Sequence, residues 1–183
     1  MSGADKVKPF KPAPLDSYPS RATQEKLTIA VEPFDKEEET RQAFDKLNPN
    51  RYGVLPVLVV MRNEGSQTLS LDSLKVEYIT ASKQRIESTP PPEVAYADSP
   101  SQPKVYRGPL PIPRIGARKK SPLSAWEIEG RSFMARMLPS GEVAYGFFYF
   151  LAPHRAGATL YITGIREASS QRELFYFELP LKP

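Results

Sequence analysis

The chain has 183 residues, of which 40% are hydrophobic and 25% charged, and 25 basic residues against 21 acidic ones give a formal net charge of +4. This length suits one globular domain with an appendage, and the mixed charges argue against a nucleic-acid binder, which is usually far more basic. The absence of cysteine excludes disulfides and thiolate metal sites, and 20 prolines argue against a helical bundle because proline breaks helix interiors.

Residues 1–25 are predicted to form a proline-rich N-terminal arm. Its four prolines alternate with lysines and small residues, which favours extended polyproline II structure over packing. The stretch from Met1 to Pro19 contains no apolar segment of the kind that a signal peptide requires. We therefore expect a cytoplasmic protein if Met1 is the native start, and a periplasmic or cell-envelope protein if it is not.

A β domain is predicted for residues 26–183, and its first strand is followed by a short helix. Hydrophobic and polar residues alternate over residues 27–32, with the period of a half-buried strand. Asp35 has the position of a helix N-cap, with Glu38 three residues later in the spacing of a capping box. The acidic residues 37–39 suit the positive end of the helix dipole, so we expect a solvated first turn rather than a cation site.

Further strands are expected between residues 54 and 86. The run Val-Leu-Pro-Val-Leu-Val-Val-Met at residues 54–61 is short and rich in β-branched residues, which indicates a strand buried on both faces. Pro56 near its start suggests an edge position or a bulge. Alternation over residues 69–78 and a turn at residues 82–84 predict antiparallel strands that reach Ile86.

The segment 89–122 is predicted to be a long proline-rich loop. Its nine prolines argue against a regular helix or a central strand, and a loop of this length in a compact domain is functional or mobile. Its apolar side chains can dock on a partner or fold back over the domain's own sheet edge, and the sequence leaves both outcomes open. Its basic residues can meet acidic protein, lipid headgroups or nucleic acid, although a solvated cluster is expected. The candidate partner-binding residues are Tyr96, Tyr106, Leu110, Ile112, Arg114, Ile115, Arg118, Lys119 and Lys120.

The last third of the chain is again predicted to be β structure, after a short helical turn around Trp126. A turn at residues 139–142, which contains proline and glycine, joins two alternating strands. The second of these strands carries aromatic residues on both faces at positions 145–150. They indicate burial on two sides or one exposed face that meets a partner, of which we favour burial. Two more strands are expected around Ile162 and over residues 175–179.

These patterns give seven or eight short strands with turn signals every ~8–12 residues. We therefore expect a mainly β fold, an antiparallel immunoglobulin-like sandwich with one short helix and a long proline-rich loop. A closed barrel is the structural alternative. A doubly wound α/β fold is not expected, because helices do not alternate with the strands.

Two blocks carry a resemblance to a known class of domains. The first is Val54–Ser66, an apolar strand opened by Leu-Pro and closed by Arg-Asn-Glu-Gly. The second is Leu-Pro-Ser-Gly-Glu at residues 138–142, followed by Gly-Phe-Phe-Tyr-Phe and by the closing Phe-Glu-Leu-Pro-Leu. These blocks resemble immunoglobulin-like, lipoprotein-type accessory domains of the bacterial cell envelope. The resemblance implies a secreted binding or assembly role, with no shared catalytic residues.

The sequence offers few side chains for catalysis. His154 is the only histidine and no Gly-x-Ser-x-Gly motif accompanies it, so we expect a surface-loop histidine. A phosphate-binding P-loop is excluded, because Phe147 and Phe148 occupy the positions at which that motif requires lysine and serine or threonine. We predict no enzyme activity, no cofactor and no metal site, although a carboxylate pair assembled by folding stays open.

The prediction for function is a non-catalytic protein-binding or accessory subunit of a larger assembly, at the cell envelope or a membrane. The loop 89–122 and the arm 1–25 would supply the contacts to a protein partner, and the basic loop residues could touch a membrane surface. Nucleic acid is not an expected partner. One rival is a carbohydrate or small-ligand binding module, which predicts a surface row of aromatic side chains, and full burial of Trp126, Tyr145 and Tyr149 would count against it. The other is a hydrolase, which predicts a cleft with two close carboxylates.

Overall fold

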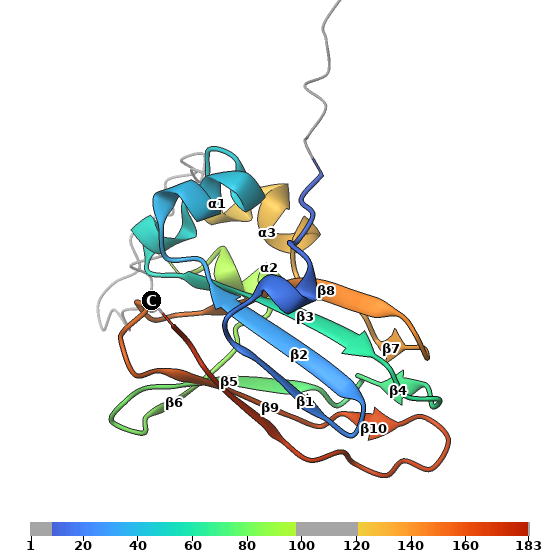
Figure 1. Ribbon diagram of the computed structural model, residues 1–183. Coiled ribbons are helices and arrows are strands. Elements are labelled where there is room, and N and C mark those ends of the chain that lie inside the picture. Colours follow the sequence, from blue (N-terminus) through green and yellow to red (C-terminus); the bar gives the residue numbers. More distant parts are fainter. Residues whose placement is uncertain (1–8, 98–120, 183) are drawn as a thin grey trace, which may run out of the picture.

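The computed structural model describes residues 9–97 and 121–182, which form a mainly β structure (Figure 1). Within these two ranges, eleven strands lie in three antiparallel sheets, accompanied by three short α-helices and three short 3₁₀-helices. The two larger sheets face each other as a sandwich, and the helices lie over the outer face of one of them. The strands outnumber the seven or eight expected, because several of them are only two to four residues long.

The first sheet has the order β1-β2-β3-β8, the second β11-β9-β5-β6 and the small third sheet β10-β4-β7. The strands of the first sheet are β1 (Arg21–Gln24), β2 (Leu27–Pro33), β3 (Leu55–Asn63) and β8 (Val143–Phe150). Those of the second are β5 (Lys75–Ile79), β6 (Arg85–Glu87), β9 (Thr159–Thr163) and β11 (Phe177–Pro180). Those of the third are β4 (Leu69–Ser70), β7 (Met137–Leu138) and β10 (Arg166–Glu167). The helices are α1 (Glu37–Phe44), α2 (Pro91–Val94), α3 (Trp126–Gly130), η1 (Leu15–Ser17), η2 (Pro49–Tyr52) and η3 (Pro122–Ser124).

The main core lies between the first and second sheets. Successive side chains of a strand point to opposite faces, so every second residue of β2 and β3 points toward the second sheet. Each of these buried side chains contributes roughly 1.5–3 kcal/mol relative to an exposed position. They are Leu27, Ile29, Val31, Val57, Val59 and Met61, and they meet Val76, Tyr78, Leu160, Ile162, Phe177 and Leu179.

The opposite face of the first sheet is buried as well, under the helices. This second core consists of the remaining residues of β2, β3 and β8 together with side chains from η1, α1, α2, η3 and α3. Its members include Ala30, Leu58, Val60, Phe147 and Tyr149 from the sheet and Leu15, Phe44, Val94, Leu123 and Ile128 from the helices. Burial from both sides confirms the expectation for residues 54–61 and explains why that run is continuously apolar.

Pro56 lies in a central strand, which corrects the expectation of an edge or a bulge. β3 pairs with β2 on one side and with β8 on the other. The Pro56 carbonyl accepts the Phe34 N–H at 2.9 Å, so the missing N–H of Pro56 would point at the Phe34 carbonyl. That carbonyl instead accepts the Asn50 side-chain amide at 2.7 Å. A side chain therefore replaces the ladder hydrogen bond that proline cannot make.

Part of the predicted N-terminal arm is packed against the first sheet, in contrast to the extended tether that its composition predicted. Leu15 and Tyr18 are buried, and the Phe10 ring lies 5.3 Å from the Phe147 ring. β1 pairs in full with β2. Residues 9–24 thus belong to the fold, because their few apolar side chains find a distant partner in the sheet.

The helices also differ in detail from the expectation. α1 has Lys36 as its N-cap instead of Asp35, and the Lys36 N–H donates to the Glu39 carboxylate at 3.4 Å instead of to Glu38. α2 lies inside the segment predicted to be free of helix, and its Val94 is fully buried. Its prolines occupy the N-cap and first-turn positions, where a missing N–H costs no helical hydrogen bond.

Candidate functional site

Eight of the nine candidate partner-binding residues lie outside the described residues. They are Tyr106, Leu110, Ile112, Arg114, Ile115, Arg118, Lys119 and Lys120. The ninth, Tyr96, follows α2 and is 73% exposed. The partner-binding role of this set therefore stays a prediction.

The outer edge of β8 is the first candidate surface that the structure adds. Phe147 donates its N–H to the Arg131 carbonyl at 2.9 Å and accepts the Phe133 N–H at 3.0 Å, on the side away from β3. Alternate residues of an antiparallel strand turn their backbone groups to the same side. Val143 and Tyr145 therefore also direct their N–H and C=O groups outward, and no hydrogen-bond partner for these groups exists among the described residues.

Local sequence explains why this edge is covered at one end and open at the other. The turn that opens β8 has Gly141 at φ +78°, as the Pro-Ser-Gly-Glu sequence predicted. Gly146 lets residues 132–133 cross the strand closely, since a Cβ there would lie 2.4 Å from the Phe133 Cα. At the far end, the Thr89 N–H donates to the Tyr149 carbonyl at 2.7 Å. The covering segments leave residues 143–145 open.

The aromatic side chains of β8 differ in burial along the strand. Phe147, Tyr149 and Phe150 are buried, in agreement with the core role that we favoured. Phe148 is half-buried and stacks on Phe133 with 5.2 Å between the ring centroids. Tyr145 is 44% exposed and Val143 49%, on the same face of the sheet as the buried Phe147 and Tyr149. The open end of β8 thus combines unpaired backbone groups with exposed apolar side chains.

The three aromatics that test the carbohydrate-binding alternative are not all buried, since Tyr149 is buried whereas Trp126 and Tyr145 are partly exposed. Tyr149 is buried, and its hydroxyl donates to the Ile128 carbonyl. Burial raises the pKa of the Tyr149 hydroxyl far above its ordinary value. Trp126 is 48% exposed, and the Arg131 guanidinium lies over its ring at 5.2 Å from the centroid.

A different aromatic pair lies on the outer face of the second sheet. Tyr161 on β9 and Tyr176 before β11 have ring centroids 5.1 Å apart, and the Arg85 guanidinium lies 5.1 Å above the Tyr161 ring. Arg85 also binds Glu77, which is a nearly buried carboxylate on β5, at 3.1 Å. No sequence pattern predicts this arrangement, because it joins residues of β5, β6, β9 and the segment before β11.

His154 is half-buried, whereas a surface-loop histidine was expected. Its Nδ1 lies 3.3 Å from the Tyr78 hydroxyl, which also accepts the Arg155 N–H at 3.0 Å. Burial lowers the pKa of His154, and its Nε2 has no hydrogen-bond partner in the described part of the chain. No serine or carboxylate hydrogen-bonds to this imidazole among those residues, so the arrangement is not a catalytic triad.

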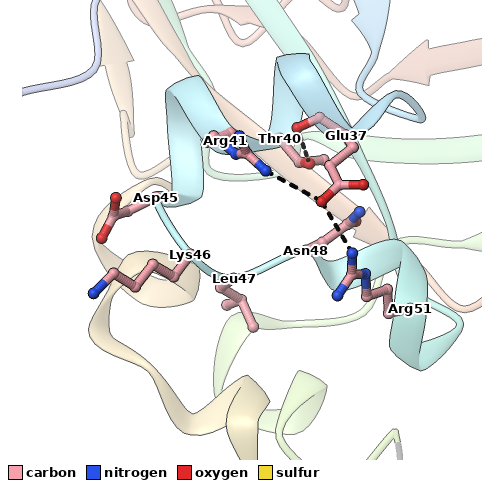
Figure 2. A pocket seen from close by; sticks show the side chains of 8 residues that line it. All are labelled: Glu37, Thr40, Arg41, Asp45, Lys46, Leu47, Asn48 and Arg51. Atoms are coloured by element: carbon pink, nitrogen blue, oxygen red, sulfur yellow. Dashed lines mark hydrogen bonds and ion pairs between the residues drawn. The ribbon is translucent and has the colours of Figure 1, made fainter.

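A polar hollow of about 440 Å³ lies between α1 and η2 (Figure 2). Arg41 of α1 and Arg51 of η2 both bind one oxygen of the Glu37 carboxylate, at 3.3 and 2.9 Å. Figure 2 shows Asn48 next to this ion pair and Asp45 and Lys46 at the opposite rim. The full lining is Glu37, Thr40, Arg41, Asp45, Lys46, Leu47, Asn48 and Arg51.

This hollow does not provide the carboxylate pair of a hydrolase. Glu37 is bound to two arginines, and Asp45 lies across the hollow from it in Figure 2. Among the described carboxyl groups, Glu32 is the one whose pKa is raised, first by burial and then by the charge of Glu39. Neither this hollow nor a smaller one of about 140 Å³ beside Arg172 is lined by Glu32.

No group of three or more histidine, aspartate or glutamate side chains in residues 9–97 and 121–182 is arranged to hold a metal ion. None of the helices in these ranges is long and apolar enough to cross a membrane. No protein-family model matches the chain, and a comparison with curated proteins finds no significant match.

Proposed function

We propose that this protein is a non-catalytic binding subunit of immunoglobulin-like type that holds an extended segment of a partner protein along the open end of β8. The observation that carries the proposal is that the N–H and C=O groups of Val143 and Tyr145 on this edge have no partner within residues 9–97 and 121–182. A strand edge presents these groups at the spacing of another strand, so an extended peptide can satisfy all of them at once.

The side chains at this edge also favour pairing with a partner strand. Edge strands that avoid pairing usually carry lysine, proline or a bulge. Residues 143–145 are Val-Ala-Tyr and carry none of these protections. Valine and tyrosine also pack well against the side chains of a neighbouring strand. The open end of β8 is thus suited to strand pairing in both its backbone and its side chains.

The wider role in the proposal is that of an accessory subunit in a larger assembly. The two packed cores hold β8 in its extended conformation before a partner binds. This preorganisation reduces the conformational entropy that binding would otherwise cost. Location at the cell envelope is also part of the proposal, and its support is the resemblance of the sequence to envelope accessory domains.

Tyr145→Pro tests the proposal with little disturbance to the fold. The Tyr145 N–H points away from β3, so proline removes a donor from the open edge while the hydrogen bonds of the β3–β8 ladder remain. We expect the variant to fold and to lose the native complex, which is isolated by a tag on the full chain. An unchanged yield of the complex from a folded Tyr145→Pro variant would contradict the proposal.

A photo-reactive amino acid at position 145 identifies the partner directly. Its matched control is the same amino acid at Phe175, which is also exposed and apolar but lies away from the β8 edge. We expect a covalent adduct with one partner protein from position 145 and none from position 175. Equal adducts from both positions would show that the edge has no special role.

The Tyr161–Tyr176 pair favours a second candidate, a carbohydrate-binding module. Sugar rings stack on exposed aromatic faces; Tyr176 is half exposed, and Arg85, whose guanidinium lies over the Tyr161 ring, could hydrogen-bond to hydroxyl groups. Titration with neutral oligosaccharides, followed by NMR, tests it. This candidate predicts shifts in residues around Tyr161 that disappear in Tyr176→Ala, whereas the proposed peptide-binding function predicts no shifts with sugars.

A further inference from the structure

The hollow between α1 and η2 holds an unusual excess of hydrogen-bond donors. Arg41 and Arg51 share a single acceptor atom, the Oε1 of Glu37. Each guanidinium carries five N–H donors, and the bonds to Glu37 use one nitrogen of each. The side-chain nitrogen of Asn48 has no hydrogen-bond partner among the described residues, although its oxygen accepts the Asn50 N–H at 3.1 Å.

The three donor side chains come from two neighbouring elements and meet at one place. Arg41 lies on α1, Asn48 is the N-cap of η2, and Arg51 lies in η2 itself. Figure 2 shows all three gathered around the Glu37 carboxylate, with the hollow beside them. The connection at residues 45–48 curves around this hollow and holds the two arginines on the same side.

Glu37 supplies the acceptor that both arginines bind. Its carboxylate is more than half exposed, as are both arginines, so water can screen this ion pair and its loss costs little. Two arginines offer planar pairs of donors that fit carboxylate or phosphate oxygens. The volume of about 440 Å³ lies in the range of small-molecule sites.

We propose that this hollow is a binding site for an oxyanion, in which Arg41, Arg51 and Asn48 bind the ligand and the Glu37 carboxylate holds its place when the site is empty. The ligand class is a small molecule or side chain that carries a phosphate or carboxylate group. The site lies on α1 and η2, away from the β8 edge, and it does not depend on the proposed peptide binding.

Titration of the full chain with inorganic phosphate, followed by the NMR signals of arginine Nε–H groups and backbone amides, tests the site. A parallel titration with acetate separates a phosphate site from a carboxylate site. We expect signals of Arg41, Arg51 and Asn48 to shift together with one of the two anions. Glu37→Gln removes the competing charge and should tighten binding by about fivefold, whereas Arg51→Gln should abolish it.

The matched control is Arg136→Gln, which removes the same charge from another exposed arginine that is paired with Asp72 at 3.4 Å. We expect this control to bind as the unchanged protein does. Equal weak binding by the unchanged protein and by Glu37→Gln would overturn the proposal. So would an equal loss in Arg136→Gln and Arg51→Gln, because general charge would then account for the binding.

Discussion

His154 illustrates how a single residue can differ from its sequence-based expectation. The sequence places it in a loop after a proline, and loops usually lie at the surface. Its ring instead packs edge-on against Tyr78, with 6.3 Å between the ring centroids, and Tyr78 is fully buried. A histidine on a core tyrosine is desolvated, which disfavours its charged form and lowers its pKa.

This pKa makes the stability of the fold depend on pH. The unfolded chain, with a histidine pKa near 6.5, binds a proton before the folded chain does. The neutral His154 imidazole therefore makes its full contribution to the free energy of unfolding above pH 6.5. This contribution is lost as the pH falls toward the lower pKa of the folded state. We expect the melting temperature to fall between pH 7 and pH 5, and to fall less in His154→Gln. An equal fall in both proteins would contradict this assignment.

Gly146 is required by a close approach of two backbones. The nearest atoms to a Cβ at this position would be the Phe133 Cα at 2.4 Å and the Phe133 nitrogen at 2.5 Å. Backbone atoms cannot move aside as a flexible side chain can. We expect Gly146→Ala to lower the free energy of unfolding by about 1–3 kcal/mol in denaturant titrations. The comparison variant is Gly53→Ala: a Cβ at position 53 would meet no atom within 4 Å, but the φ of +75° strains any other residue, so this variant tests backbone strain without a clash.

At the scale of elements, the outer face of the second sheet places two carboxylates opposite each other. Glu77 on β5 and Glu87 on β6 are direct cross-strand partners, and like charges in such positions are destabilising. Lys75 binds both, at 3.5 and 3.0 Å, and the Glu87 carboxylate is the main cause of its raised pKa. Lys75 therefore offsets the repulsion between the two carboxylates.

Removal of this lysine should expose the repulsion. We expect Lys75→Met to lower the melting temperature, because Glu77 and Glu87 would then repel each other. Among the described residues, only the Arg85–Glu77 ion pair would remain to offset this repulsion. The double variant with Glu87→Gln should recover most of the loss. If the double variant melts no higher than Lys75→Met, the repulsion between the two carboxylates is not the cause.

Elements whose pattern is local could be predicted from the sequence, and elements that depend on distant contacts could not. The alternation at residues 27–32 predicted β2, and the short β-branched run at 54–61 predicted β3. The expectation that the first of these strands is half-buried was wrong, because the helices cover its outer face as well. The packing of residues 9–24 had no such signal, since it depends on the Phe10–Phe147 contact across the chain. Composition alone indicated a tether there.

At the scale of the whole molecule, the two candidate surfaces depend on which elements come together. The sandwich follows from strand patterns, but the open end of β8 depends on where residues 131–133 stop covering it. The hollow between α1 and η2 joins Glu37 and Arg51, and no motif predicts that the chain turn between them brings these two side chains together. Neither surface was predicted from the sequence, because a sequence shows side chains and not which backbone groups remain unpaired.

The central claim, an open strand edge that pairs with a partner, is tested most directly by hydrogen exchange at single amides of β8. In the isolated protein, we predict fast exchange at Val143 and Tyr145 and slow exchange at Ala144 and Phe147, whose N–H groups are bonded within the fold. In the native complex, Val143 and Tyr145 should become protected. Slow exchange of both amides in the isolated protein, or unchanged fast exchange in the complex, would contradict the account.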